Sequence, residues 1–363
     1  MAERAKLGPV TCAGCGLLCD DVILDLSGEA VSLHPACGLG ATWFSERIHR
    51  LPGTPEATIG GEPAGVEAAL TRAAELLRSA RRPLVYGFDG ATGEDARAAV
   101  ALADRLGALV MTENVTGPWP GASALAQRGV TTATLGEIRD RSRLVIIWGE
   151  DPELTHPRLL ERLGFGGDAP ARSGAPRTLV VIDDRDTPTA ERADLRLGWP
   201  RERDLEALVT LHALHRQRPP APTDLHAPLG GLLERIGGVP HVAFVHGPAL
   251  TGGEGGQRRA LALHELTRAL SHERHVVTLA LTRAAGTTGA RDALTWQTGY
   301  AGNVDLACGH PELLVATHPT EEVDVALRIE GPPAALAAGV AEIALVSRSE
   351  GGPGPGPAVS ILT

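Results

Sequence analysis

The sequence has little of what marks several common classes of protein. Aromatic residues make up 3% of its 363 residues. No stretch approaches the ~20 consecutive apolar residues that a membrane-spanning helix needs. The first ten residues, MAERAKLGPV, lack the apolar run of a secretory signal. A formal net charge of −10 offers no basic surface for nucleic acid or an anionic membrane. We therefore expect a cytoplasmic protein with no nucleic-acid or membrane partner.

Cysteine is also scarce, with five residues, but four of them are clustered near the start of the chain. Cys12, Cys15 and Cys19 have C-x2-C-x3-C spacing, and Cys37 follows in SLHPACGLG. Cytoplasmic thiols stay reduced, so such a cluster favours metal or iron–sulfur binding over disulfides. Four thiolates can bind a [4Fe–4S] cluster or a structural zinc, and the C-x3-C step departs from the common zinc pattern. The fifth, Cys308, is interpreted as a small buried residue.

From residue 83 onward, apolar runs alternate with longer segments of helical periodicity. The runs predicted as strands are PLVYGF (83–88), ALVMTEN (108–114), SRLVIIWGEDP (142–152), RTLVVIDDRD (177–186), HVAFVHGPAL (241–250), HVVTLAL (275–281), ELLVAT (312–317) and VDVALRI (323–329). Continuous apolar runs separated by helices predict a multi-domain α/β fold of parallel sheets flanked by helices. Ligands in such sheets bind at the loops that follow the strands.

Composition suggests where the chain divides. RQRPPAPTDLHAPLGG (216–231) is rich in proline and predicts a linker, and RSEGGPGPGP (348–357) predicts an unpacked tail. The expected segments are a cysteine-rich region (1–55), a first α/β domain (56–140), a dinucleotide-fold-like α/β segment (141–215), a linker (216–234), a second α/β domain (235–347) and a tail (348–363).

Two loops after predicted strands carry polar groups. WGEDPELTHP (148–157) places Glu150, Asp151 and His156 at a strand end, where they would contact a ligand or cap the next helix. HGPALTGGEGGQ (246–257) could hold a phosphate or carboxylate on backbone N–H groups. It lacks the Lys-Ser/Thr of a P-loop, so we interpret it as a tight structural turn.

Three stretches resemble one known superfamily. CAGCGLLCDD with the later Cys37 resembles the iron–sulfur segment of the molybdopterin oxidoreductases, and residues 180–211 and LTWQTGYAGNVDLACGHPELL (294–314) extend the likeness. Within it, the sequence most resembles the B subunits of formylmethanofuran dehydrogenase and of the bacterial formyltransferase/hydrolase complex. The resemblance implies the α/β architecture of formate dehydrogenase domains I–III and a [4Fe–4S] cluster on the four cysteines.

One expected motif of redox-active members is missing. Their tungsten or molybdenum is held by a cysteine that is followed by histidine and then Gly-Pro. The matching place here is TENVTGPW, where Val115 and Thr116 precede Gly117 and Pro118. Valine supplies no thiolate and threonine no imidazole. By this resemblance the metal ligand is lost, and a molybdopterin or tungstopterin is not expected.

The resemblance then implies a B subunit without redox activity of its own. Its partners would be subunits A, C and D of a complex that transfers a formyl group between a pterin carrier and a methanofuran-type amine and releases formate. The methanofuran-type cofactor would be handled through the complex, with Trp296, Gln297, Thr298 and Gly299 either contacting it or packing against a neighbouring domain or subunit. Two alternatives remain open: a redox-active formylmethanofuran dehydrogenase subunit with a molybdenum or tungsten pterin and a [4Fe–4S] cluster, and a free-standing metal-binding module.

Overall fold

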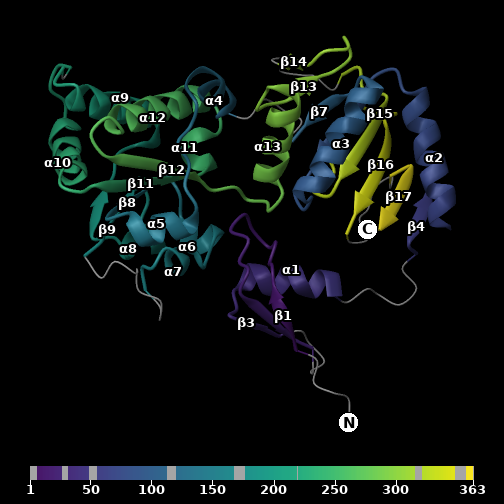
Figure 1. The fold of residues 1–363 in the computed structure, drawn as a ribbon, viewed down its shortest axis with the longest axis horizontal. Helices are drawn as coiled ribbons and strands as arrows, with labels where there is room; N and C mark the ends of the chain where they lie inside the picture. The colour runs from purple at the N-terminus through teal and green to yellow at the C-terminus, as the bar shows by residue number, and fades with distance from the viewer. Residues whose placement is uncertain are drawn as a thin grey trace. The chain divides into compact units, whose positions relative to one another are not determined.

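The structure, a computed structural model, describes residues 6–26, 32–48, 55–112, 120–166, 176–218, 220–314, 321–347 and 357–362. The chain forms two compact units (Figure 1). The first unit comprises residues 1–119 together with 283–363, and the second comprises residues 120–282. The polypeptide therefore leaves the first unit once, builds the second and returns.

The first unit is built on a nine-stranded sheet of order β14-β13-β7-β6-β15-β16-β17-β4-β5. Its strands are β4 (Ala57–Ile59), β5 (Glu62–Ala64), β6 (Pro83–Gly87), β7 (Leu109–Met111), β13 (Val304–Asp305), β14 (Glu312–Leu313), β15 (Val325–Ile329), β16 (Ala341–Val346) and β17 (Val359–Leu362). The five central strands, from β7 to β17, run parallel, and the outer pairs are antiparallel. Continuous burial along β6 and most of β15 explains why both strands are largely apolar; the buried Arg328 is the charged exception in β15.

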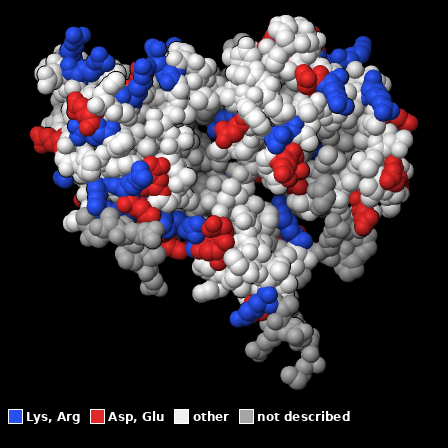
Figure 2. Space-filling model, in the orientation of Figure 1, with Lys and Arg blue, Asp and Glu red and all other residues white. Residues whose placement is uncertain are grey.

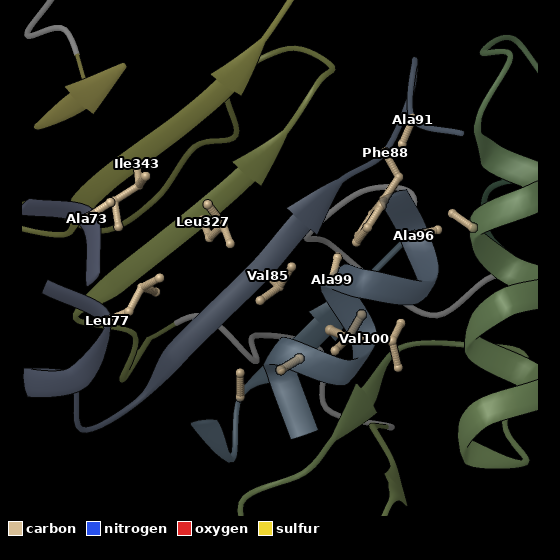
Figure 3. Close-up of a cluster of buried hydrophobic side chains, with 14 of the residues drawn as sticks. Ala73, Leu77, Val85, Phe88, Ala91, Ala96, Ala99, Val100, Leu327 and Ile343 are labelled. Atoms are coloured by element: carbon tan, nitrogen blue, oxygen red, sulfur yellow. The ribbon is translucent and has the colours of Figure 1, made fainter. Parts of the chain in front are cut away.

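Three helices contribute to one hydrophobic core with this sheet: α2 (Val66–Ser79), α3 (Gly93–Leu106) and α13 (Thr287–Thr298). Their buried positions are mostly alanine, so the helix backbones can approach the strands closely. Figure 3 shows Val85 of β6 and Leu327 of β15 on the same side as Ala99 and Val100 of α3. This packing fixes the loops at the carboxyl ends of β6 and β15.

The second unit contains a fully parallel five-stranded sheet of order β10-β9-β8-β11-β12. Its strands are β8 (Leu144–Trp148), β9 (Thr178–Ile182), β10 (Leu195–Leu197), β11 (His241–His246) and β12 (His275–Ala280). Its helical segments are α4 (Ala122–Arg128), α5 (Leu135–Arg141), α6 (Pro152–Thr155), α7 (Leu159–Arg162), α8 (Pro188–Glu191), η1 (Arg201–Arg203), α9 (Asp204–His215), α10 (His226–Gly237), α11 (Pro248–Thr251) and α12 (Gly256–Leu270). The strand order reverses between β8 and β11, which is where such sheets bind ligands.

The cysteine-rich N-terminal module is small. Strands β1 (Lys6–Val10), β2 (Val22–Asp25) and β3 (Ser32–His34) form an antiparallel sheet, and α1 (Gly38–Ile48) follows. The first three cysteines lie in the connection between β1 and β2, and Cys37 directly precedes α1.

The structure divides the chain differently from the ranges expected from composition. Residues 235–282 complete the sheet of the second unit, whereas 283–347 rejoin the first. The proline-rich stretch connects two neighbouring helices of one unit, α9 and α10, and α10 begins inside it. The end of the expected tail forms β17, which pairs with β16. Composition marks breaks in the helices and strands, but strand pairing decides which segments share a core.

Within the described ranges, no helix combines the length and the apolar character that crossing a membrane requires. On the face drawn in Figure 2, side chains of both signs are interspersed rather than gathered by sign.

The backbone of Gly286, just before α13, lies close to the Phe88 carbonyl at the end of β6. Substitution of this glycine tests that close packing. A Cβ atom there would lie 1.9 Å from the Phe88 carbonyl oxygen, so Gly286→Ala should lower the free energy of unfolding by about 2 kcal/mol or more. Gly289→Ala, on α13 with 4.0 Å to its nearest neighbour, should leave it unchanged or raise it by up to ~1 kcal/mol. Urea unfolding of the full chain measures both, and equal stability of the two variants would contradict the packing described.

Candidate functional site

Two loops bring cysteine sulfurs together in the N-terminal module. The N–H of Gly14 donates to Cys12 Sγ, and the N–H of Gly40 donates to Cys37 Sγ, each at 3.4 Å. A Cβ atom on Gly40 would lie 3.1 Å from Cys12 Sγ and 3.5 Å from Cys37 Sγ. Only glycine at this position lets the start of α1 approach both sulfurs.

The other two cysteines of the cluster belong to the same loop. Burial raises the pKa of the Cys15 thiol; the backbone at Leu17 opposes this, and the nearby Cys37 and Cys12 add smaller increases. Cys15 therefore lies close enough to both sulfurs to sense their charge. Cys19 is buried, and its carbonyl accepts the Cys12 N–H at 2.8 Å, which closes the loop.

These residues fit an iron–sulfur cluster by their chemistry. The four thiols lie on two glycine-containing loops, and backbone N–H groups point at sulfur, an arrangement that stabilises cluster thiolates. All five cysteines of the chain lie in described residues, and none forms a disulfide. Within the described ranges, no three His, Cys, Asp or Glu side chains are grouped as a metal-ion site. Cys308 is exposed, so its interpretation as a buried residue is wrong.

The WQTG segment shapes the end of α13 and contacts α3. Trp296 is 74% exposed, and the Arg97 guanidinium lies 5.2 Å from the centre of its ring. Gln297 Nε2 donates to the Arg97 carbonyl at 3.3 Å. Thr298 Oγ1 bonds the Leu294 carbonyl, and Gly299 ends the helix in a left-handed conformation. Trp296 and Gln297 thus present an ordered surface, whereas Thr298 and Gly299 cap the helix.

The position of the lost metal ligand lies outside the described residues. Val115 and Thr116 belong to 113–119, directly after the described end of the β7 region. The sequence-based placement of these two residues therefore stays a prediction.

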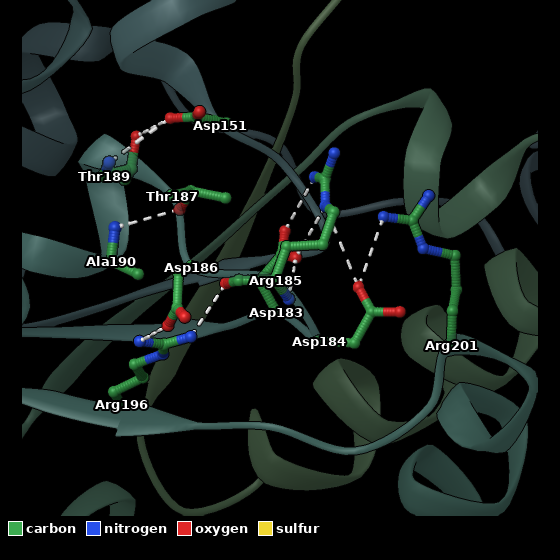
Figure 4. Close-up of polar contacts among 10 residues, drawn as sticks. All are labelled: Asp151, Asp183, Asp184, Arg185, Asp186, Thr187, Thr189, Ala190, Arg196 and Arg201. Atoms are coloured by element: carbon green, nitrogen blue, oxygen red, sulfur yellow. Dashed lines mark hydrogen bonds and ion pairs between the residues drawn. The ribbon is translucent and has the colours of Figure 1, made fainter.

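The reversal point of the second sheet is filled by an acidic side chain. Glu150, which follows β8, is 2% exposed. A Cβ atom on Gly247, which follows β11, would lie 1.9 Å from Glu150 Oε2. The neighbouring Asp151 accepts hydrogen bonds from the Thr189 hydroxyl and N–H (Figure 4). A carboxylate thus occupies the space between the ends of β8 and β11.

Further acids follow β9 at the same edge. The Asp183 carboxylate accepts the Arg185 N–H at 2.9 Å and two guanidinium hydrogen bonds at 3.0 Å (Figure 4). Burial alone would raise the pKa of Asp183, but these bonds from Arg185 hold it below its usual value. Burial raises the pKa of Asp204 despite its two indole donors, Trp148 and Trp199.

The space left at this edge is small. A crevice with a volume of about 10 Å³ is lined by Gly149, Ile182, Asp183, Asp184, Trp199, Arg201 and Asp204. This volume holds about one water molecule and is far below what a small organic ligand needs. His156, one of the sequence candidates, is buried and bonds the Thr282 carbonyl and the Thr155 hydroxyl, so its described role is to hold loops together.

The first sheet reverses between β6 and β15, and there too the loops close on each other. A Cβ atom on Gly331 would lie 3.1 Å from the Asp89 carboxyl carbon, and one on Gly90 would lie 3.4 Å from Glu330 Oε2. Each acidic side chain therefore packs on a glycine of the opposite loop. Gly286 closes the site further through its N–H, which donates to the Asp89 carbonyl at 2.7 Å.

Several backbone donors at this edge have acceptors within the protein. The Phe88 N–H donates to the Ile329 carbonyl, and the Glu330 N–H donates to the Leu345 carbonyl. At the start of α3, Thr92 and Asp95 form a reciprocal capping box that uses the donors a phosphate would need. Phe88 and Glu330 both have positive φ, so the two loops are held in a conformation that few side chains adopt.

Neither sheet edge fits the phosphates of a pterin nucleotide. The superfamily resemblance raises the question of whether the chain binds this cofactor. Phosphates need free N–H groups and no nearby negative charge, whereas here carboxylates and internal hydrogen bonds occupy those places. Sequence reasoning identified Glu150 and Asp151 but missed Asp89, Glu330 and Gly286. Their signal was the glycine-rich GFDGATG after a predicted strand, but its partners lie some 200 residues away in the chain.

No family model matches the chain. It is 27% identical over 336 residues to the B subunit of a tungsten-containing formylmethanofuran dehydrogenase 2 from Methanocaldococcus jannaschii, across 83% of this chain and 72% of that protein. The B subunit of the enzyme of the same name from Methanococcus maripaludis is 32% identical over 214 residues, which are 56% of this chain and 49% of that protein.

A solved structure has the same fold. The formyltransferase/hydrolase complex (FhcABCD) from Methylorubrum extorquens, in complex with methylofuran, contains a chain that aligns with a TM-score of 0.66 at 22% identity, over 84% of this chain and 86% of that chain. The expected fold class, an α/β fold of parallel sheets flanked by helices, is confirmed. The resemblance seen in the sequence is confirmed as well: the chain is a homologue of the formylmethanofuran dehydrogenase B subunits.

Proposed function

We propose that the chain is a non-redox B subunit of a cytoplasmic formyltransferase/hydrolase complex. In that complex, partner subunits A, C and D would pass a formyl group between a pterin carrier and a methanofuran-type amine and release formate. The observation that carries the proposal is the closure of both sheet edges by carboxylates of the chain itself, at Glu150 in one unit and at Asp89 and Glu330 in the other. A subunit that excludes nucleotide phosphates lacks the anchor of a metal–pterin centre.

The fold comparison supports the same assignment. The chain aligns with 86% of a chain from a complex that handles methylofuran, whereas it matches 72% and 49% of the two tungsten-containing dehydrogenase subunits. Val115 and Thr116 at the expected Cys-His position agree with it. The names of those relatives favour the alternative, a redox-active subunit with a molybdenum or tungsten pterin.

In this role the chain contributes surfaces rather than reacting groups. The ordered Trp296 and Gln297 would line a space shared with the carrier or pack against a partner subunit, and the Arg97 contact holds the Trp296 ring in place. The carboxylates at the sheet edges would maintain the loops from which these surfaces extend. Formyl transfer and hydrolysis would occur on the partner subunits.

The four cysteines would hold a [4Fe–4S] cluster as a structural centre. When bound, the cluster would supply covalent links between the two loops of a module that has few buried apolar side chains. Cys12, Cys15 and Cys19 would provide three thiolates from one loop, and Cys37 would close the site from the other.

Assembly and metal content test the proposed role. Co-produced with subunits A, C and D, the chain should purify as a stoichiometric complex that releases formate from the formylated methanofuran-type carrier, with neither tungsten, molybdenum nor pterin in stoichiometric amount. The physical reason is that carboxylates and internal hydrogen bonds occupy the described loops at the sheet edges, where phosphates would bind. Elemental analysis and pterin fluorescence make the measurement. Stoichiometric tungsten or molybdenum together with viologen-linked oxidation of formylmethanofuran would establish the alternative instead.

The cluster has a test that is independent of activity. Full-length protein prepared without oxygen should contain about four irons per chain and absorb as a [4Fe–4S] protein. Cys12→Ser and Cys37→Ser should each lose most of the iron and melt at a lower temperature, because one loop is released. Cys308→Ser is the matched control, since this exposed cysteine lies outside both loops. Absence of iron from the parent protein, with melting unchanged in both variants, would refute the cluster.

A further inference from the structure

Exposed apolar side chains gather on the N-terminal module. Of the eleven large hydrophobic residues exposed among the described residues, five lie between residues 6 and 48: Leu7, Leu18, Leu26, Leu39 and Ile48. The module buries few apolar residues in return, and three of them are Cys12, Cys15 and Cys19. Segments this small usually need a metal, a disulfide or a partner surface to be stable.

Two of these leucines flank the cysteine loops. Leu18 is 43% exposed and lies between Cys15 and Cys19, whereas Leu39 is 38% exposed and follows Cys37. The loops that carry them lie side by side, because a Cβ atom on Gly14 would lie 2.9 Å from the Leu39 carbonyl oxygen. Leu18 also has φ = 51°, a conformation that disfavours bulky side chains. The fold therefore presents a large apolar side chain to solvent where Asn or Gly would be less strained.

We propose that Leu18 and Leu39 form a docking surface for another subunit of the complex, one that presents an apolar centre with a basic rim. Asp20 is exposed directly beside the Leu18 loop, and Asp21 follows it, so the rim on this side is acidic. The whole chain carries a net charge of −10. A second copy would place like charges opposite each other, whereas a basic rim would be attracted. The proposal rests on the proposed function and names the surface by which this chain joins the assembly.

The test compares the Leu18→Asn/Leu39→Gln double variant with a control variant, each made in the full chain and co-produced with subunits A, C and D. Leu18→Asn suits the left-handed backbone better than leucine does, so it removes the apolar contact without adding strain. Leu39→Gln keeps a good helix former in the first turn of α1. Leu70→Gln is the matched control, because Leu70 is 48% exposed on α2 and lies outside the module.

The Leu18→Asn/Leu39→Gln double variant should bind the partner subunits roughly tenfold or more weakly, as expected for two residues at the centre of an interface. Its melting temperature as an isolated chain should match that of the parent, and Leu70→Gln should assemble normally. Added salt should also weaken assembly of the parent chain, because it screens the attraction between the acidic rim of this chain and the basic rim of its partner.

Four results would overturn the proposal. The first is parental affinity in the double variant, which would refute the docking surface and leave the proposed function intact. The second is a drop in the melting temperature of the double variant that accounts for its lost assembly, because the leucines would then act within the chain. The third is a dimer of the parent chain that the double variant cannot form, because the occupant would then be a second copy. Failure of the parent chain itself to assemble would refute this proposal and the proposed function together.

Discussion

In each unit a carboxylate packs against a glycine at the end of a central parallel strand, and the proposed function depends on this arrangement. Glu150 packs against Gly247 in one unit, and Asp89 packs against Gly331 in the other. Strand ends and helix N-termini normally attract phosphates, because their backbone N–H groups lack partners. Here the negative charge belongs to the protein, and a second one brought into the same partly buried space would be repelled.

The same arrangement has a structural benefit. Hydrogen bonds within the chain hold the loops at the sheet edges. The Gly286 N–H donates to the Asp89 carbonyl, and the Phe88 N–H donates to the Ile329 carbonyl. The Arg185 guanidinium donates to the Asp183 carboxylate. Contacts within the chain therefore hold the loops at both sheet edges. The exposed apolar side chains include Trp296 on α13 and the leucines beside the cysteine loops. Side chains of this kind are suited to contact other proteins.

Much of the fold could be predicted from the sequence because buried parallel strands leave an unmistakable apolar run, as in PLVYGF and SRLVIIWGEDP. The division into units could not, because it depends on pairing between β6 and β15, which lie far apart in the chain. The cysteine loops were identified from spacing, and the structure brings Cys12 and Cys37 to the same glycine. The site at the edge of the first sheet was not predicted for the same reason as the division into units. Asp89, Glu330 and Gly286 are far apart in the sequence and come together only in the folded chain. Cys308 was placed inside because cysteine is usually buried, but it lies on an exposed turn.

Nucleotide binding tests the exclusion of phosphates most directly, and the protein contains its own reporter. Trp148 and Trp199 both donate to Asp204, and Trp199 and Asp204 line the crevice at the edge of the second sheet. Tryptophan emission of the full chain should stay constant as GDP is added up to millimolar concentration, after correction for absorption by guanine. A saturable change at micromolar GDP would show that phosphates are accepted, and it would contradict the account.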